Sequence, residues 1–186
     1  MENTMNIRML KAAVAGLVLS VSGLANAALI FTVNEVGSDV VITGSGSFDL
    51  TGTSLAGSST FNGGFMNSST ALAVGNPGSF DVYNGFTTNS GAFGTGSFFD
   101  GSGDSGDLIG FDSIQQGGLV FLPTGYVSKN ALSGSTTLVG HSFASLGLIT
   151  GTYDYATTDD TITVQVQVPE PTTLAGLASR RFKKQS

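Results

Sequence analysis

Three aspartates in a Gly/Ser-rich stretch are the residues whose type and spacing best suit a ligand. Asp100, Asp104 and Asp107 lie within residues 100–107, which read Asp-Gly-Ser-Gly-Asp-Ser-Gly-Asp. Hard carboxylate oxygens at this spacing on a glycine-rich loop suit Ca²⁺. The full pattern D-x-[DN]-x-[DN]-G is absent, and Asp-Gly pairs are also ordinary turn formers. We therefore take the three aspartates as calcium candidates on a loop and expect no other metal or cofactor.

Two serines stand in contexts that resemble nucleophile motifs. Ser105 lies in Gly-Asp-Ser-Gly-Asp, similar to the segment around a trypsin-like serine, and Ser142 lies in Gly-His-Ser-Phe-Ala, similar to an α/β-hydrolase elbow. Both chemistries need a histidine base, upstream of the serine in the first case and late in the chain in the second. His141 is the only histidine. The sequence therefore predicts turn or strand positions for both serines.

Adjacent acidic residues also invite comparison with a glycosidase, which places two carboxylates on either side of a glycosidic bond. Asp159 and Asp160 are such neighbours. They fall at a predicted hairpin tip, where adjacent side chains point apart, so we interpret them as a solvated turn. No catalytic constellation is visible, and we expect a protein that is not an enzyme.

The charges of the 186-residue chain are distributed unevenly. Seven basic residues oppose thirteen acidic ones, and Lys129 is the only basic residue between residues 28 and 168, where eleven acidic residues give a net charge of −10. Such a segment repels phosphate, which excludes nucleic-acid binding. The absence of cysteine excludes a disulfide scaffold. Thirteen Phe and four Tyr favour a folded domain over a disordered one.

Alternating polar and apolar residues predict two hairpins that frame this middle segment. Residues 161–168 alternate without error, residues 149–155 alternate before them, and residues 157–160 form the connecting loop. Near the start, residues 29–36 and 39–50 form a second hairpin that turns at Gly37 and Ser38. One buried and one wet face is typical of an antiparallel sheet.

Five further apolar runs are bounded by turn residues, and none shows sustained helical periodicity. They cover residues 78–83, 91–99, 108–111, 118–122 and 136–143. Short strands at this spacing predict an all-β fold, a single antiparallel β-sandwich or jelly-roll-like domain with Gly/Ser-rich loops.

The first 27 residues have the composition of a secretory signal peptide. Arg8 and Lys11 precede an apolar run at residues 12–24, and Ala25 and Ala27 flank a small-x-small cleavage site before Ala28. The apolar run is 13 residues long, about 20 Å of helix, which is shorter than the ~30 Å core of a bilayer. We therefore expect export by the Sec translocon and cleavage by signal peptidase.

The C-terminus carries a second address. The last predicted strand stops at a proline in Val168-Pro169-Glu170-Pro171, and the chain ends on a basic segment with Arg180 and Arg181. These features, with the signal peptide, resemble the PEP-CTERM sorting family. The middle segment also resembles substrates of that family at residues 122–128, 132–135, 143–148 and 151–153. The resemblance implies an exosortase as the sorting enzyme and the surface or biofilm matrix of a Gram-negative bacterium as the destination.

The tail departs from the family pattern in one respect. Eight residues separate the motif from the arginines, about 12 Å of helix, too short to span a ~30 Å hydrocarbon core. The expected organisation is a signal peptide at 1–27, a β-rich mature domain at 28–168 and a truncated PEP-CTERM-like tail at 169–186.

Two roles remain open for the mature domain, with a third behind them. The first is a structural or interaction protein among extracellular polysaccharides. The alternative is a carbohydrate-binding β-sandwich in which Tyr126, Tyr153, Tyr155 and the Phe residues stack on sugar rings. A glycan-acting hydrolase comes third, because no catalytic set is visible.

Overall fold

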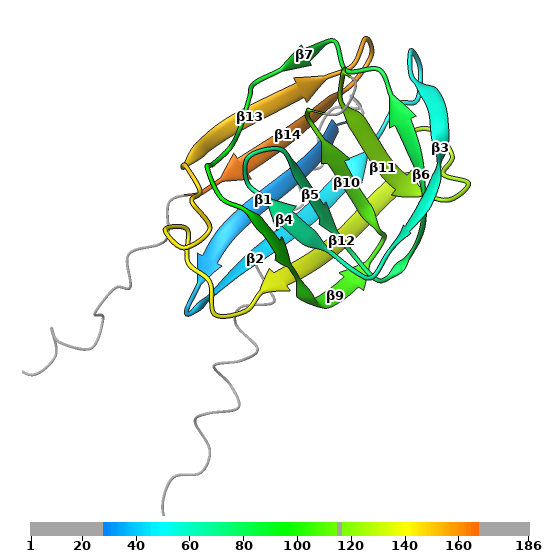
Figure 1. Cartoon of the computed structure of the whole chain (residues 1–186). Coiled ribbons are helices and arrows are strands. Elements are labelled where there is room, and N and C mark those ends of the chain that lie inside the picture. Colours follow the sequence, from blue (N-terminus) through cyan, green and yellow to red (C-terminus); the bar gives the residue numbers. More distant parts are fainter. Residues whose placement is uncertain (1–27, 115–116, 168–186) are drawn as a thin grey trace, which may run out of the picture.

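Two seven-stranded sheets pack face to face in the computed structural model, which describes residues 28–114 and 117–167 (Figure 1). Sheet I holds both the first and the last strand of the domain. In spatial order its strands are β7 (Thr88–Asn89), β13 (Gly151–Ala156), β14 (Thr161–Val166), β1 (Ala28–Val36), β2 (Asp39–Ser47), β12 (Ala131–Leu138) and β9 (Ser102–Gly106).

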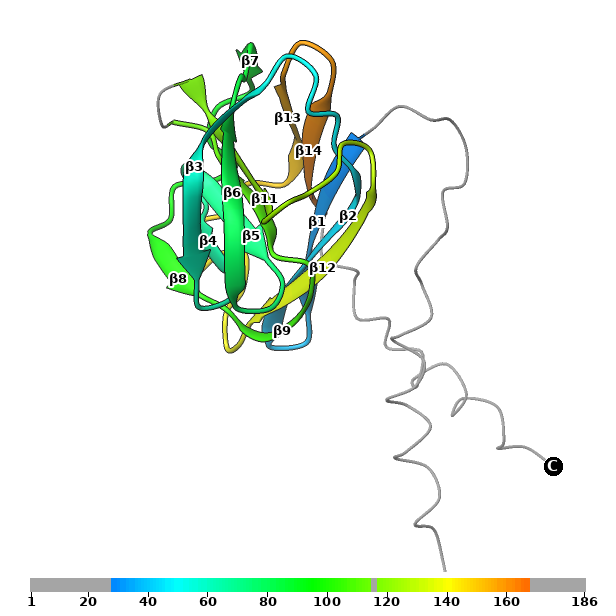
Figure 2. The ribbon, with the colours of Figure 1, turned by 90° about the vertical axis from the view of Figure 1, so that its right-hand side faces the viewer.

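Sheet II is built from the middle of the chain and covers one face of sheet I (Figure 2). In spatial order its strands are β3 (Ser54–Phe61), β6 (Gly78–Asn84), β11 (Leu119–Pro123), β10 (Ile109–Asp112), β5 (Ala71–Val74), β4 (Phe65–Asn67) and β8 (Phe98–Asp100). All named elements of the described residues are strands. The predicted all-β sandwich is therefore confirmed.

Both predicted hairpins form. β1 and β2 pair antiparallel up to Val36 opposite Asp39, and β13 and β14 pair up to Ala156 opposite Thr161. The first and last strands then lie side by side and run parallel, in register from Ala28 opposite Thr161 onward. This pair is the one parallel pairing among the described strands.

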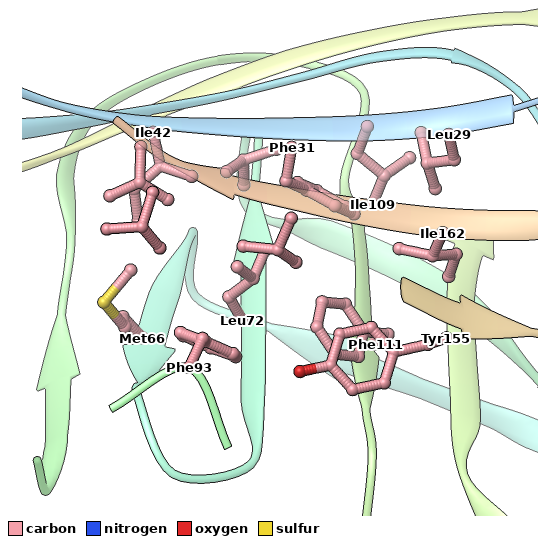
Figure 3. Packing of buried hydrophobic residues seen from close by; sticks show 14 of the residues in the cluster. Leu29, Phe31, Ile42, Met66, Leu72, Phe93, Ile109, Phe111, Tyr155 and Ile162 are labelled. Carbon is pink, nitrogen blue, oxygen red and sulfur yellow. The ribbon is translucent and has the colours of Figure 1, made fainter. Parts of the chain in front are cut away.

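The inter-sheet core consists of large apolar side chains that project from both sheets toward each other (Figure 3). Phe111 of β10 is completely buried and packs its ring 5.9 Å from that of Phe31 and 4.6 Å from that of Tyr155. A Cβ placed at Gly44 of β2 would lie 2.8 Å from Ile109 and from Phe31. Glycine at this position of the buried face therefore lets the two sheets approach closely.

Several strands lie outside the segments that alternation identified. β3, β4, β5 and β9 were not predicted, and β12 covers residues 131–138 rather than 136–143. Of residues 91–99, only Phe98 and Phe99 belong to a named strand, β8, although Phe93 is completely buried. β3 and β9 are edge strands with exposed side chains, so they require backbone pairing but no buried face.

Candidate functional site

The calcium candidates lie on strands and at a strand end rather than on a loop, so the expectation of a loop was wrong. Asp100 ends β8, Asp104 lies in β9, and Asp107 follows β9. β9 pairs with β12, and Gly134 of β12 makes this possible, because a Cβ there would lie 2.4 Å from the Asp107 carbonyl oxygen. The short, polar, exposed strand carried no hydrophobic alternation to reveal it.

Two of the three carboxylates bind separate protein groups. The Thr136 hydroxyl donates to Asp104 Oδ1 at 2.5 Å, and the Ser133 amide donates to Asp107 Oδ2 at 2.9 Å. Within residues 28–114 and 117–167, no group of three or more His, Cys, Asp or Glu side chains is arranged to hold a metal ion. Calcium binding stays a prediction from the sequence.

The two serine motifs lie in different hydrogen-bond networks. Ser105 Oγ lies 2.8 Å from Ser135 Oγ of the neighbouring strand β12. His141 Nδ1 lies 3.3 Å from Ser145 Oγ, which also accepts the Ser142 amide at 2.9 Å. The histidine thus belongs to the turn after β12, and the positions of both serines agree with the strand and turn assignments made from the sequence.

The tyrosines proposed for sugar stacking are tied into the fold. Tyr155 is completely buried, its hydroxyl donates to the Gly91 carbonyl at 2.6 Å, and burial raises its pKa. Its ring faces Phe111 in the core, so the expectation that Tyr155 stacks on a sugar was wrong. Tyr153 is partly buried and donates its hydroxyl to the Ile149 carbonyl at 2.9 Å.

Tyr126 holds the loop before β12 against the end of β2. The Phe48 amide donates to its hydroxyl oxygen at 2.9 Å, and that oxygen lies 2.8 Å from the Asn130 carbonyl oxygen. The ring packs partly buried against the inter-sheet core. Its main contacts are therefore structural.

A polar network that we call the clasp joins three loops at this end of the sandwich. Asp49 Oδ2 lies 3.0 Å from Lys129 Nζ, and Asp49 Oδ1 accepts the Thr51 amide at 3.0 Å and the Ser128 hydroxyl at 3.1 Å. The Asp49 amide in turn donates to Asp160 Oδ2 at 2.5 Å. The loops at residues 48–53 and 124–130 both cross between the sheets, so the clasp fixes those two crossings to the hairpin at residues 157–160.

The two carboxyl groups of the clasp have opposite pKa shifts. The Thr51 amide, followed by its hydroxyl and Lys129, holds the pKa of Asp49 well below its usual range. Burial raises the pKa of Asp160 to about 6, although the amides of Asp49 and Thr161 donate to its carboxylate. The interpretation of Asp159 and Asp160 as a solvated turn was therefore wrong for Asp160, which is 6% exposed, and correct for Asp159.

Opposed pKa values in neighbouring carboxyl groups often mark an acid and a base. Here Asp49 binds Thr51, Ser128 and Lys129, and both oxygens of Asp160 accept backbone amides. These contacts join loops of the fold, so we interpret the clasp as structural.

A second apolar cluster lies on the outer face of sheet II. In β5, Leu72 belongs to the inter-sheet core whereas Ala71 and Ala73 belong to this second cluster, and successive side chains of a strand point to opposite faces. We call it the outer cluster; its aromatic members are Phe61, Phe65, Phe80 and Phe121. Sequence reasoning missed it, because strands buried on both faces show apolar runs without alternation.

Stacked rings connect the two halves of sheet II through this cluster. Phe61 of β3 stacks on Phe80 at 4.2 Å and meets Phe65 of β4 edge-on at 4.9 Å, although four strands separate β3 from β4 in the sheet. Phe98 of β8 stacks on Phe65 at 5.1 Å and is itself 55% exposed. The outer cluster therefore ends in an aromatic ring at the surface.

The residues of the two predicted addresses lie almost wholly outside the described residues. These are the cleavage residues Ala25 and Ala27 and the sorting residues Val168, Pro169, Glu170, Pro171, Arg180 and Arg181. Ala28, the predicted first residue of the mature chain, is the first residue of β1. Among the residues described, no helix is long and apolar enough to cross a bilayer.

Comparisons of the chain with protein-family models, with curated proteins and with solved structures gave no match.

Proposed function

We propose that this chain is exported to the outer surface or extracellular matrix of a Gram-negative bacterium, where it has a structural or interaction role among exopolysaccharides. In this proposal the Sec translocon and signal peptidase act on its N-terminus, and an exosortase-type enzyme acts on its PEP-CTERM-like tail.

The position of the predicted addresses relative to the strands is the observation that carries the proposal. β1 begins at Ala28, directly after the predicted cleavage site. β14 ends at Val166, the Gln167 amide still donates to the Val33 carbonyl at 3.1 Å, and the predicted motif starts one residue later. Removal of either address would leave every described strand intact, as processing of an exported domain requires.

Mass spectrometry of the protein recovered from medium, envelope and matrix tests the proposal. We expect the N-terminus at Ala28 in all three fractions and a C-terminus cut near the motif. An Ala27→Arg variant should retain the leader, whereas Glu170→Ala should change only the C-terminal processing. A chain that keeps Met1 and stays in the cytoplasm would refute export; an intact Ser186 in the medium would refute only the sorting step.

A carbohydrate-binding role is the second candidate, and the exposed ring of Phe98 is what favours it. Aromatic rings at a protein surface offer an apolar face to a sugar ring, and Phe98 is held in place by its stacking on Phe65. Retention on extracellular polysaccharide should then be saturable and should fall in Phe98→Ala but not in Val127→Ala, a change at another exposed apolar residue. Retention that does not saturate would exclude this role.

A further inference from the structure

The four edge strands of the sandwich differ in how they are protected against pairing with another chain. Edge strands are commonly protected by shortness, by charged residues or by irregular pairing. β7 has two residues, and β8 has three and carries Asp100. β9 carries Asp104, and its register with β12 is irregular. β3 has eight residues and neither a charge nor a proline.

β3 is also exposed on both faces. Seven of its eight residues are exposed, and only Phe61 is partly buried. Its register with β6 is irregular between Leu55 and Gly57 and regular from Gly57 to Phe61. Figure 1 shows β3 at the border of sheet II, and no described strand pairs with its far side. Alternate residues therefore present backbone amides and carbonyls outward, ready for another strand.

The charge distribution favours a second copy of the same chain as the occupant of this edge. Residues 28–168 carry a net charge of −10, so two copies repel each other over most of their surface. β3 itself is uncharged, and the nearby Asp81 carboxylate is already engaged by the Ser58 hydroxyl at 2.6 Å and the Gly125 amide at 2.9 Å. An edge without charge lets two acidic chains meet, and it offers no basic group to attract a different acidic partner.

We infer that two copies of this chain associate through antiparallel pairing of their β3 strands about a two-fold axis at Ser59. This joins the two second sheets into one continuous sheet. The inference goes beyond the proposed function and does not depend on export. The contact is small, since it involves one strand from each copy, so the association should depend on concentration.

The side chains of β3 favour this register. With Ser59 opposite Ser59 of the second copy, Phe61 of each chain lies opposite Gly57 of the other. A Cβ built at Gly57 meets no atom within 4 Å, so this position is open. An aromatic residue opposite an edge glycine covers the bare backbone and stabilises the strand pair. Phe61 already belongs to the outer cluster, so pairing extends that cluster across the axis.

Sedimentation equilibrium of the full chain over a range of concentrations tests the association. We expect a monomer–dimer equilibrium for the unaltered chain and loss of the dimer in Ser59→Lys, which sets two ammonium groups opposite each other on the axis. Ser102→Lys makes the same change at an exposed residue of β9 and should keep the dimer. Equal circular dichroism spectra and melting temperatures of the two variants would show that both are folded.

Disulfide trapping tests the register. The chain has no cysteine, so a single introduced thiol reports only contacts between copies. Ser59→Cys should give a covalent dimer with oxidised glutathione, because antiparallel partners have Cβ atoms about 4.5–5.5 Å apart, close to the span of a disulfide. Ser102→Cys should remain monomeric on denaturing gels. A monomeric unaltered chain, a dimer that survives Ser59→Lys, assemblies larger than two, or equal trapping at both positions would overturn the inference.

Discussion

The inter-sheet core and the outer cluster bury aromatic residues in two different ways. Phe111 in the inter-sheet core is enclosed by both sheets and contacts rings from each of them. Phe80 in the outer cluster is equally buried, at 2% exposure, but its covering consists of other rings such as the partly buried Phe61. One cluster is closed by a second layer of backbone, whereas the other is closed by its own side chains.

This difference teaches how a glycine- and serine-rich chain builds a sandwich. Sheet I buries one face, so its strands alternate and its polar side is free to be Thr, Ser and Gln. Sheet II buries apolar residues on both faces of its central strands, as in β5, where all four residues are buried. The second sheet therefore stabilises itself partly without the first.

The largest expected effect is that of Phe111→Ala in the inter-sheet core. Removing this ring leaves a cavity between two backbone layers that relax little, and we expect a loss of about 4 kcal/mol in the free energy of unfolding. Guanidinium denaturation at constant slope measures it. A loss below about 1 kcal/mol would mean that the sheets close over the gap, and the comparison of the two clusters would fail.

A smaller effect is expected for Phe80→Ala in the outer cluster. The neighbouring Phe61 and Phe98 rings are partly or largely exposed, so they are free to move into the space, and we expect a loss of about 2 kcal/mol. The same denaturation experiment compares it directly with Phe111→Ala. Equal losses in the two variants would show that the outer cluster is as rigid as the inter-sheet core.

The clasp should reveal itself in the pH dependence of stability. The pKa of Asp160 is raised to about 6 from an ordinary value of about 3.9, so between these pH values the folded chain holds a proton that the unfolded chain has released. The free energy of unfolding should therefore fall as the pH rises from about 4 to about 6. Asp160→Asn should remove this decline, measured as the change in slope of stability against pH.

Asp49 acts in the opposite direction and serves as the control. Its pKa is lowered in the folded chain, so its contribution is present above pH ~4 and is lost as the pH falls below that value. Asp49→Asn should therefore flatten the acid limb and leave the decline between pH ~4 and ~6 in place. A decline that persists in Asp160→Asn would assign it to another group.

The smallest effect is expected for Phe98→Ala, at the exposed end of the outer cluster. More than half of this ring faces solvent, so the free energy of unfolding should change by less than about 0.5 kcal/mol. Thermal unfolding monitored by circular dichroism checks this. A loss close to that of Phe80→Ala would place Phe98 within the outer cluster proper.

The part of the fold that alternation revealed is the part with one buried face. Residues 28–47 and 151–166 alternate, and they form the hairpins of sheet I as expected. β5 shows no alternation because both of its faces are buried, and β3 shows none because neither face is. Period-two patterning reports a difference between two faces and is silent where there is none.

The candidate site was harder to anticipate because its partners come together only in the folded chain. Asp160 was placed on the correct hairpin, yet its burial depends on the Asp49 amide, 111 residues away in the sequence. Asp104 and Asp107 were grouped by their spacing, but pairing of β9 with β12 gives each its own partner on β12. Spacing along the chain indicated which residues were near, and not which way they faced.

The parallel pairing of β1 with β14 gives the domain a direction in which it resists force. Six residue pairs join the two strands, with Ala28 at one end of the pairing and Val166 at the other. Tension applied between the two ends of the domain therefore pulls these strands along each other, which loads all their hydrogen bonds at once in shear rather than opening them one by one. A domain held at its C-terminal end and pulled at its N-terminal end would meet its mechanical barrier at this pair, in the middle of sheet I.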